Sequence, residues 1–163
     1  MALGDRVEPR GLNISSNSWS SSFLPVAPEM LEIETGLSQT KVEIVPVTTL
    51  DQVEHRFVDP SDRVFLKIDA QGYEPNILLG GDAFLTRCHA VQIEMALFRS
   101  YHEQKNMLEM IEFMNQRGFR LVDLERGFWD DRTGYLVEVD GVFVRVDDLP
   151  EALRREPRKA TGN

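Results

Sequence analysis

Apolar and polar positions along the chain follow the pattern of short strands separated by helices. The segment KVEIVPV over 41–47 is β-branched and alternating, and the run VFLKI over 64–68 is almost continuously apolar. A short apolar run of this kind is typical of a central parallel strand that is covered on both faces. Pro46 lacks the N–H that a sheet ladder needs, so the first of these strands should end there or lie at a sheet edge.

Three helices are predicted between the strands. The first covers about 50–57, where Thr49 and Gln52 form a capping-box pattern. The second begins near Glu74-Pro75 and ends at Gly80-Gly81, because Pro is tolerated in a first helical turn and Gly terminates helices. The third includes 107–114, where four apolar residues recur at i, i+3, i+4 and i+7.

The same alternation, bounded by turn residues, predicts further strands over 11–15, 90–95, 119–124 and 135–146. Strands and helices alternate along most of the chain, and the last two strands follow each other directly. This order predicts one open α/β sheet that ends in an antiparallel pair. We expect a single domain over 1–148 and a polar, frayed tail over 149–163.

Composition narrows the classes of function. The 163 residues are 42% hydrophobic and 28% charged, as in an ordinary globular domain, and the net charge of −9 opposes binding to nucleic acid. Cys88 is the only cysteine, so no disulfide forms within the chain. The sequence has no run of about 20 apolar residues and no signal-peptide core. It therefore predicts a soluble, cytoplasmic protein with neither nucleic acid nor a membrane as partner.

Three acidic residues mark the candidate site. Asp69 ends one predicted central strand, Glu94 lies near the end of the next, and Glu74 begins the helix between them. Ligands of open α/β sheets bind outside the carboxyl ends of the strands, and clustered carboxylates raise one another's pKa or attract a cation. Alternatively, Asp69 caps a turn, Glu74 complements a helix dipole and Glu94 is solvated. The pattern favours a functional role for Asp69, as a base or as a metal ligand, and leaves Glu74 open.

Two other features have alternative interpretations. The serine-rich segment 15–22 contains Trp19 and precedes Phe23. It is a surface loop whose two aromatic residues pack on the core, or a loop that closes over a ligand. No two histidines have the spacing of metal ligands, so no metal site is predicted, although His102 is near enough to the strand of Glu94 to reach the same crevice.

Three linked stretches point to a known family. They are VFLKIDAQGYEPNILLGG, VQIEMALFRSYHEQKNMLEMIEFMNQRGFRLVDLE and VEVDGVFVR. Together they resemble the FkbM family of methyltransferases, over roughly 4–145. The resemblance implies a Rossmann-like mixed sheet of the class I methyltransferase type. It also implies an enzyme that uses S-adenosylmethionine to methylate a hydroxyl group of a small molecule or sugar.

The resemblance assigns roles to individual positions. Asp69 matches the acidic residue beside the reacting methyl group, and Glu74 continues that motif. The next strand-end motif faces the acceptor. The residues expected to bind the cofactor are Gly4, Asp5, Asp69, Gln71 and Gly72, and those expected to bind the acceptor are Glu94, Tyr101 and His102.

The sequence departs from the family pattern at its beginning. Family members begin with a strand and a glycine-rich turn for the cofactor, and none of the eleven glycines here forms a G-x-G. The chain should lack this segment and bind S-adenosylmethionine weakly by itself. The alternative is a non-catalytic remnant that associates with itself or with a completing chain. A Rossmann oxidoreductase is excluded by the absent fingerprint.

Overall fold

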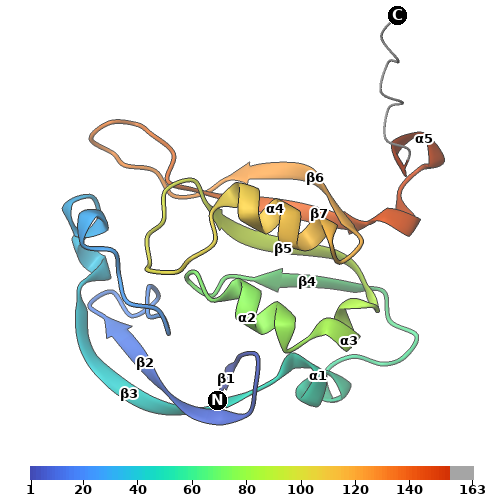
Figure 1. Ribbon diagram of the computed structural model, residues 1–163, viewed down its shortest axis with the longest axis horizontal. Coiled ribbons are helices and arrows are strands. Elements are labelled where there is room, and N and C mark those ends of the chain that lie inside the picture. The colour runs from blue at the N-terminus through green and yellow to red at the C-terminus, as the bar shows by residue number, and fades with distance from the viewer. Residues whose placement is uncertain (155–163) are drawn as a thin grey trace, which may run out of the picture.

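The computed structural model describes residues 1–154, in which the strands form two separate sheets (Figure 1). The first sheet contains β1 (Ala2–Leu3), β2 (Glu8–Ser15) and β3 (Gln39–Thr48) in the order β1-β3-β2. Strand β1 is parallel to β3, and β2 is antiparallel to it.

The second sheet contains β4 (Val64–Ile68), β5 (Cys88–Ala96), β6 (Phe119–Arg126) and β7 (Glu138–Arg145). Its order is β4-β5-β7-β6, with β4 parallel to β5 and the other pairs antiparallel. The predicted adjacent parallel strands and the closing antiparallel pair are therefore confirmed. The prediction of one continuous sheet is wrong, because β3 pairs with β2 along its length and with β1 at its end, and does not join β4.

Strand β3 fits the prediction made from its proline only in part. Pro46 lies opposite Pro9 of β2, and β1 reaches β3 only at Val47 and Thr48. The proline therefore sits where β3 has one neighbour, as expected, but the strand continues for two residues beyond it. Four strands begin at other positions than the sequence predicts: β2 starts at Glu8, β3 at Gln39, β5 at Cys88 and β7 at Glu138.

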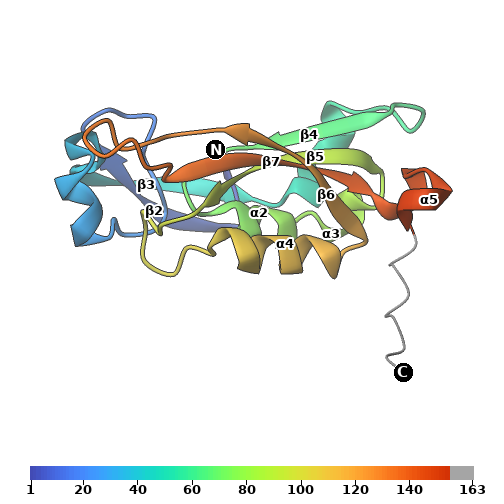
Figure 2. The ribbon, with the colours of Figure 1, turned by 90° about the horizontal axis from the view of Figure 1, so that it is seen from above.

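Three helices cover one face of the second sheet, as Figure 2 shows. They are α2 (Glu74–Leu79), α3 (Asp82–Leu85) and α4 (Met107–Asn115). Helix α4 begins with a capping box between Asn106 and Glu109, and its Met110 and Met114 are buried, as the apolar spacing predicts. Within residues 1–154, no helix covers β5, β6 and β7 on the opposite face. Of the side chains on that face, Phe65 and Lys67 of β4 are exposed, whereas those of β5 and β7 are buried or half-buried.

The predicted helix over 50–57 is shorter and mixed. It consists of α1 (Leu50–Val53) followed by a 3-10 turn, η3 (Glu54–Arg56). The Thr49 side chain does not cap the helix, so the predicted capping box does not form. Gln52 instead accepts a hydrogen bond from the Thr48 hydroxyl, at 3.2 Å. The remaining elements are η1 (Pro28–Glu32), η2 (Thr35–Leu37), η4 (Val146–Asp148) and α5 (Glu151–Arg154).

The predicted tail over 149–163 falls mostly outside the described residues. Within the described part, Leu149 is buried and α5 follows it. No helix among residues 1–154 is both long enough and apolar enough to span a bilayer.

Candidate functional site

The carboxyl ends of β4 and β5 bring two of the predicted acids together. Ile68 lies beside Ile93 in the parallel pair, so Asp69, which follows β4, and Glu94, which lies near the end of β5, are at the same end of the sheet. The side-chain amide of Gln71 joins them: its Nε2 donates to Asp69 Oδ1 at 3.1 Å and to Glu94 Oε2 at 3.2 Å. The predicted convergence of these carboxylates at one end of the sheet is confirmed.

A tight turn places Gln71 between the acids. Gln71 and Gly72 have φ values of +55° and +89°, in the left-handed region that is costly for any residue except glycine. Glu74, which is 3% exposed, holds this turn because its carboxylate accepts hydrogen bonds from the backbone N–H groups of Ala70 and Gly72. Burial raises the pKa of Glu74 to about 7, against the lowering effect of these hydrogen bonds. In this structure Glu74 organises the turn.

Strand β7 adds a carboxyl group that the sequence prediction missed. Glu138 lies diagonally across from Glu94 on the same face of the β5–β7 pair and accepts a hydrogen bond from the Ser100 hydroxyl at 2.9 Å. Burial, and then the charge of Glu138, raise the pKa of Glu94 to about 9. Burial also raises the pKa of Glu138. The two carboxyl groups therefore hold at least one proton between them at neutral pH.

A cavity of about 280 Å³ opens beside these carboxyl groups. Its lining combines three acids, two aromatic residues and several uncharged polar groups, and no Lys or Arg of the described residues belongs to it. The lining residues are Asn17, Trp19, Ser20, Glu34, Leu37, Gln71, Glu94, Ser100, Phe128 and Glu138. Such a site suits an uncharged or cationic small molecule, because an anion would meet only negative charge.

The two acceptor-binding residues expected after β5 lie in different surroundings. Tyr101 is 1% exposed, and its hydroxyl lies 2.8 Å from Gln71 Oε1 and 3.0 Å from the carbonyl oxygen of Ser20. His102 is exposed and does not line the cavity; its backbone N–H donates to the carbonyl of Pro25. Tyr101 thus belongs to the site, whereas His102 lies outside the cavity.

Gly4 and Asp5, expected on the cofactor side, reach the turn through Tyr73. Gly4 follows β1 directly, and a Cβ placed there would be 2.8 Å from Val47, so no side chain fits. The Tyr73 hydroxyl donates to Asp5 Oδ1 at 3.4 Å and accepts from Arg10 at 2.6 Å. Asp5 and the Gln71–Gly72 turn are therefore connected by the residue that follows the turn.

The serine-rich segment contributes to the site in a way that combines both interpretations made from the sequence. Phe23 packs on the core against Tyr73, with ring centroids 4.9 Å apart, whereas Trp19 is 81% exposed and lines the cavity. The hydroxyl of Ser22 donates to the carbonyl of Gln71 at 2.7 Å. The expectation that both aromatic residues pack on the core is therefore wrong for Trp19, whose exposed side chain lines the cavity instead.

Comparison with known proteins identifies the family. The family model described as the Methyltransferase FkbM domain matches residues 1–121. The chain belongs to the FkbM methyltransferase family. No curated protein and no solved structure matches the chain.

Within this FkbM domain, the matched residues contain Asp69, Gln71 and Glu94, whereas Glu138 lies beyond them. The alternating pattern VEVD at the start of β7 is the signal that would have found Glu138, because it places Glu138 and Asp140 on one face. Among residues 1–154, no group of three or more His, Cys, Asp and Glu side chains is arranged to hold a metal ion.

Proposed function

We propose that this FkbM domain transfers a methyl group from S-adenosylmethionine to a hydroxyl group of an uncharged small molecule or sugar, with Glu94 as the general base. The observation that supports this most is the Glu94–Glu138 pair at the cavity wall. A carboxylate whose pKa is raised by burial is a stronger base than an ordinary Glu.

The hydrogen-bond donors of the cofactor match hydrogen-bond acceptors near the Gln71–Gly72 turn. S-adenosylmethionine carries an ammonium group and ribose hydroxyls, which donate hydrogen bonds. Asp5 and the exposed Asp69 offer carboxylate oxygens, and Gly72 offers a turn without a side chain. These residues would hold the cofactor, which when bound supplies an electrophilic methyl group.

The chain's own residues prepare the acceptor hydroxyl. In its charged form, Glu94 removes the proton from a hydroxyl group that lies in the cavity, and the bonding electron pair stays on the oxygen. Glu138 is held by Ser100 at 2.9 Å and keeps its position when Glu94 changes charge. Trp19 and Phe128 provide apolar faces at the same cavity. Such faces suit a sugar ring, whose C–H groups pack on aromatic side chains while its hydroxyls reach the acids.

The pKa of Glu94 sets the expected pH dependence. A general base works only when it is deprotonated, and Glu94 is mostly protonated at pH 7 because its pKa is about 9. The rate of methyl transfer should therefore rise with pH and level off above about pH 9.

The test is transfer of isotope-labelled methyl from S-adenosylmethionine to a panel of acceptors by the purified protein between pH 6 and 10. Neutral polyols and sugars should be methylated, and sugar phosphates should not, because the cavity has acidic side chains and no basic one. Transfer to phosphorylated acceptors alone would contradict the proposed acceptor class. A rate that falls between pH 7 and 9 would contradict Glu94 as the base.

A non-catalytic role, as a module that binds a second copy of itself, is the second candidate. It is favoured by Phe65 on β4, the edge strand of the second sheet, because this large apolar side chain is 56% exposed. Absence of methyl transfer to every acceptor, together with a dimer in sedimentation equilibrium that Phe65→Ser dissociates, would favour this role over the enzymatic one.

A further inference from the structure

The Gln71 side chain lies between two carboxyl groups at the end of the second sheet. Its Nε2 donates to Asp69 Oδ1 at 3.1 Å and to Glu94 Oε2 at 3.2 Å, so the NH₂ group uses both of its hydrogens on these acids. Gln71 and Glu94 line the cavity, whereas Asp69 is exposed and is not part of the lining. Gln71 therefore links an acid of the cavity to an acid outside it.

The partners of the Gln71 amide fit one orientation of it. The Tyr101 hydroxyl lies 2.8 Å from Gln71 Oε1 and can donate to it, because the Ser20 carbonyl nearby already accepts from the Ser15 hydroxyl at 2.8 Å. In the reverse orientation, the amide oxygen would face the Asp69 carboxylate, and two acceptors would meet. The contacts with Tyr101 and Asp69 therefore fix the amide.

The backbone around Gln71 is held as well. Gln71 has a φ of +55°, a left-handed conformation that is costly for a residue other than glycine. Its carbonyl accepts from the Ser22 hydroxyl at 2.7 Å, and Glu74 accepts from the N–H groups of Ala70 and Gly72 on either side. A costly conformation that its surroundings maintain in this way is typical of a residue whose side chain has a functional task.

The amide sets the separation of the two acids. Both oxygens lie within 3.2 Å of one nitrogen, which keeps them in the range of roughly 4–6 Å over which neighbouring charges change a pKa. The charge of Asp69 is the third cause of the raised pKa of Glu94, after burial and the charge of Glu138. A change of charge at Asp69 is therefore felt at Glu94.

Asp69 is the acid of this group that a ligand can reach. The other charged and titratable groups around Glu94 come from the β4–α2 turn, from β7, from the loop after β5 and from β4. They are Glu74, Glu138, Asp140, Tyr101 and Lys67, which lies 4.0 Å from Asp140. Each of these acids is buried or half-buried, whereas Asp69 is exposed. A cationic ligand can therefore offset the charge of Asp69 and leave the other acids as they are.

We propose that Gln71 is the positioning residue of the site: it holds Asp69 at a fixed distance from Glu94, so that a cation bound at Asp69 weakens the hold of Glu94 on its proton. The inference rests on the proposed function, in which the positively charged S-adenosylmethionine lies at Asp69. Glu94 is then ready to take a hydroxyl proton when the cofactor is in place. At saturating cofactor, the rate of methyl transfer should reach half its maximum at a lower pH than the titration midpoint of Glu94 in the free protein.

Titration of Glu94 by nuclear magnetic resonance tests this coupling without cofactor or acceptor. The signal is that of the carboxyl carbon, which Glu94→Gln assigns. Asp69→Asn removes the negative charge and keeps an oxygen for Gln71, so the proton affinity of Glu94 should fall about tenfold. The matched control, Glu112→Gln, removes an exposed charge on α4 and should leave the affinity within about twofold of wild type. Equal midpoints in Asp69→Asn and Glu112→Gln would overturn the inference.

Gln71→Asn tests the positioning role of the amide. Asn tolerates the left-handed backbone but is one methylene shorter, so it cannot reach Asp69, Glu94 and Tyr101 together. The exposed Asp69 side chain is then free to move into water, and adding Asp69→Asn should change the proton affinity of Glu94 by less than about threefold. A change as large as in the wild-type background would show that Gln71 does not position the acids. Gln71→Gly, which suits the same backbone, replaces Gln71→Asn if that variant does not fold.

A cofactor experiment separates this inference from the proposed function. Addition of S-adenosylmethionine to the wild type should lower the titration midpoint of Glu94, and S-adenosylhomocysteine, which lacks the sulfonium charge, should lower it less. A shift in Asp69→Asn without a shift on adding S-adenosylmethionine would support the coupling and count against the proposed cofactor. No shift in either experiment would overturn the coupling, whether or not the protein transfers methyl groups.

Discussion

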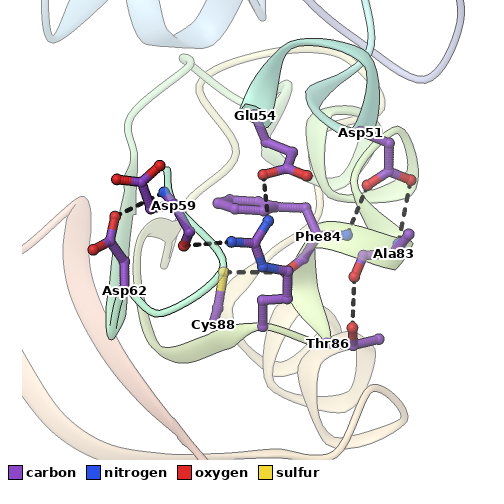
Figure 3. A network of polar contacts seen from close by, with 9 residues as sticks. Asp51, Glu54, Asp59, Asp62, Ala83, Phe84, Thr86 and Cys88 are labelled. Carbon is purple, nitrogen blue, oxygen red and sulfur yellow. Dashed lines mark hydrogen bonds and ion pairs between the residues drawn. The ribbon is translucent and has the colours of Figure 1, made fainter. Parts of the chain in front are cut away.

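The carboxyl groups at the two ends of the second sheet have different partners. At the end away from the cavity, Arg87 donates to Glu54 at 2.6 Å and to the carbonyl of Asp59 at 2.8 Å, while Asp51 accepts from the backbone N–H groups that begin α3 (Figure 3). At the cavity end, Glu94 faces other acids, and burial followed by the charge of Glu138 raises its pKa from 4.5 to about 9.

Because of this difference, we expect the charged residues at the far end to contribute to folding stability and those at the cavity end to contribute to the reaction. At the far end, carboxylates that have a cation or N–H donors as partners hold α1, α3 and the loop before β4 together. Carboxyl groups that face one another are costly when charged, and perturbed groups of this kind cluster at functional sites. Changes at the far end should therefore affect unfolding, and changes at the cavity end should affect turnover.

The largest expected effect is on turnover in Glu94→Gln. Loss of a general base typically lowers kcat by about 10²–10⁴-fold. The melting temperature at neutral pH should not fall, because Gln has the shape of Glu94, whose carboxyl group is mostly protonated and uncharged there. Asp69→Asn is the matched comparison and should mainly raise the KM for S-adenosylmethionine. The reverse pattern, with kcat lowered in Asp69→Asn and KM raised in Glu94→Gln, would indicate that Asp69 is the general base.

The second effect is on folding, in Arg87→Met. This change removes the ion pair with Glu54 and the hydrogen bond to Asp59, and should lower the free energy of unfolding by about 1–3 kcal/mol. Urea titration measures the loss, and kcat/KM should stay at the wild-type value. Arg63→Met is the control: it removes an exposed contact to His89 and should cost less than about 1 kcal/mol. If the two variants were equally stable, the contacts of Arg87 would not contribute to the stability of the fold as we expect.

The smallest effect is a change in how stability depends on pH. The folded-state pKa of Glu94, about 9, lies above the ordinary value of 4.5, so its contribution is present in full below about pH 4.5 and is lost as pH rises to about 9. Glu74 acts in the same direction up to about pH 7. In Glu94→Gln, the free energy of unfolding should fall less between pH 7 and 9 than in wild type. Glu112→Gln, on the exposed side of α4, should behave as wild type; a Glu94→Gln profile parallel to it would argue against a buried, protonated Glu94.

Local patterns predicted the elements that form the cavity end. Strand β4 is a short apolar run that Asp69 follows directly, Glu94 lies two residues before the end of β5, and the i, i+3, i+4, i+7 spacing predicted α4. Their pairing follows because parallel neighbours share the edge where a ligand binds. Each of these predictions uses only residues that are close together in the sequence.

The remaining features depend on contacts between distant segments. Whether β3 joins β4 or stays with β2 is decided by pairing between strands, which no local pattern contains. The alternating pattern VEVD sets Glu138 on one face of a strand, but only the pairing of β7 with β5 places it beside Glu94, and Tyr101 contacts the carbonyl of Ser20, 81 residues away. The sequence thus locates Asp69 and Glu94, and the tertiary structure adds Glu138 and decides which acids line the cavity.

The exposure of the tryptophans has a practical consequence for spectroscopy. The chain has two, Trp19, which is 81% exposed at the cavity, and Trp129, which is 42% exposed and lies against Arg126. Neither indole belongs to the hydrophobic core, so the emission of the folded protein should already resemble that of indole in water. Fluorescence is then a poor gauge of unfolding for this protein, and a sensitive one for whatever enters the cavity beside Trp19.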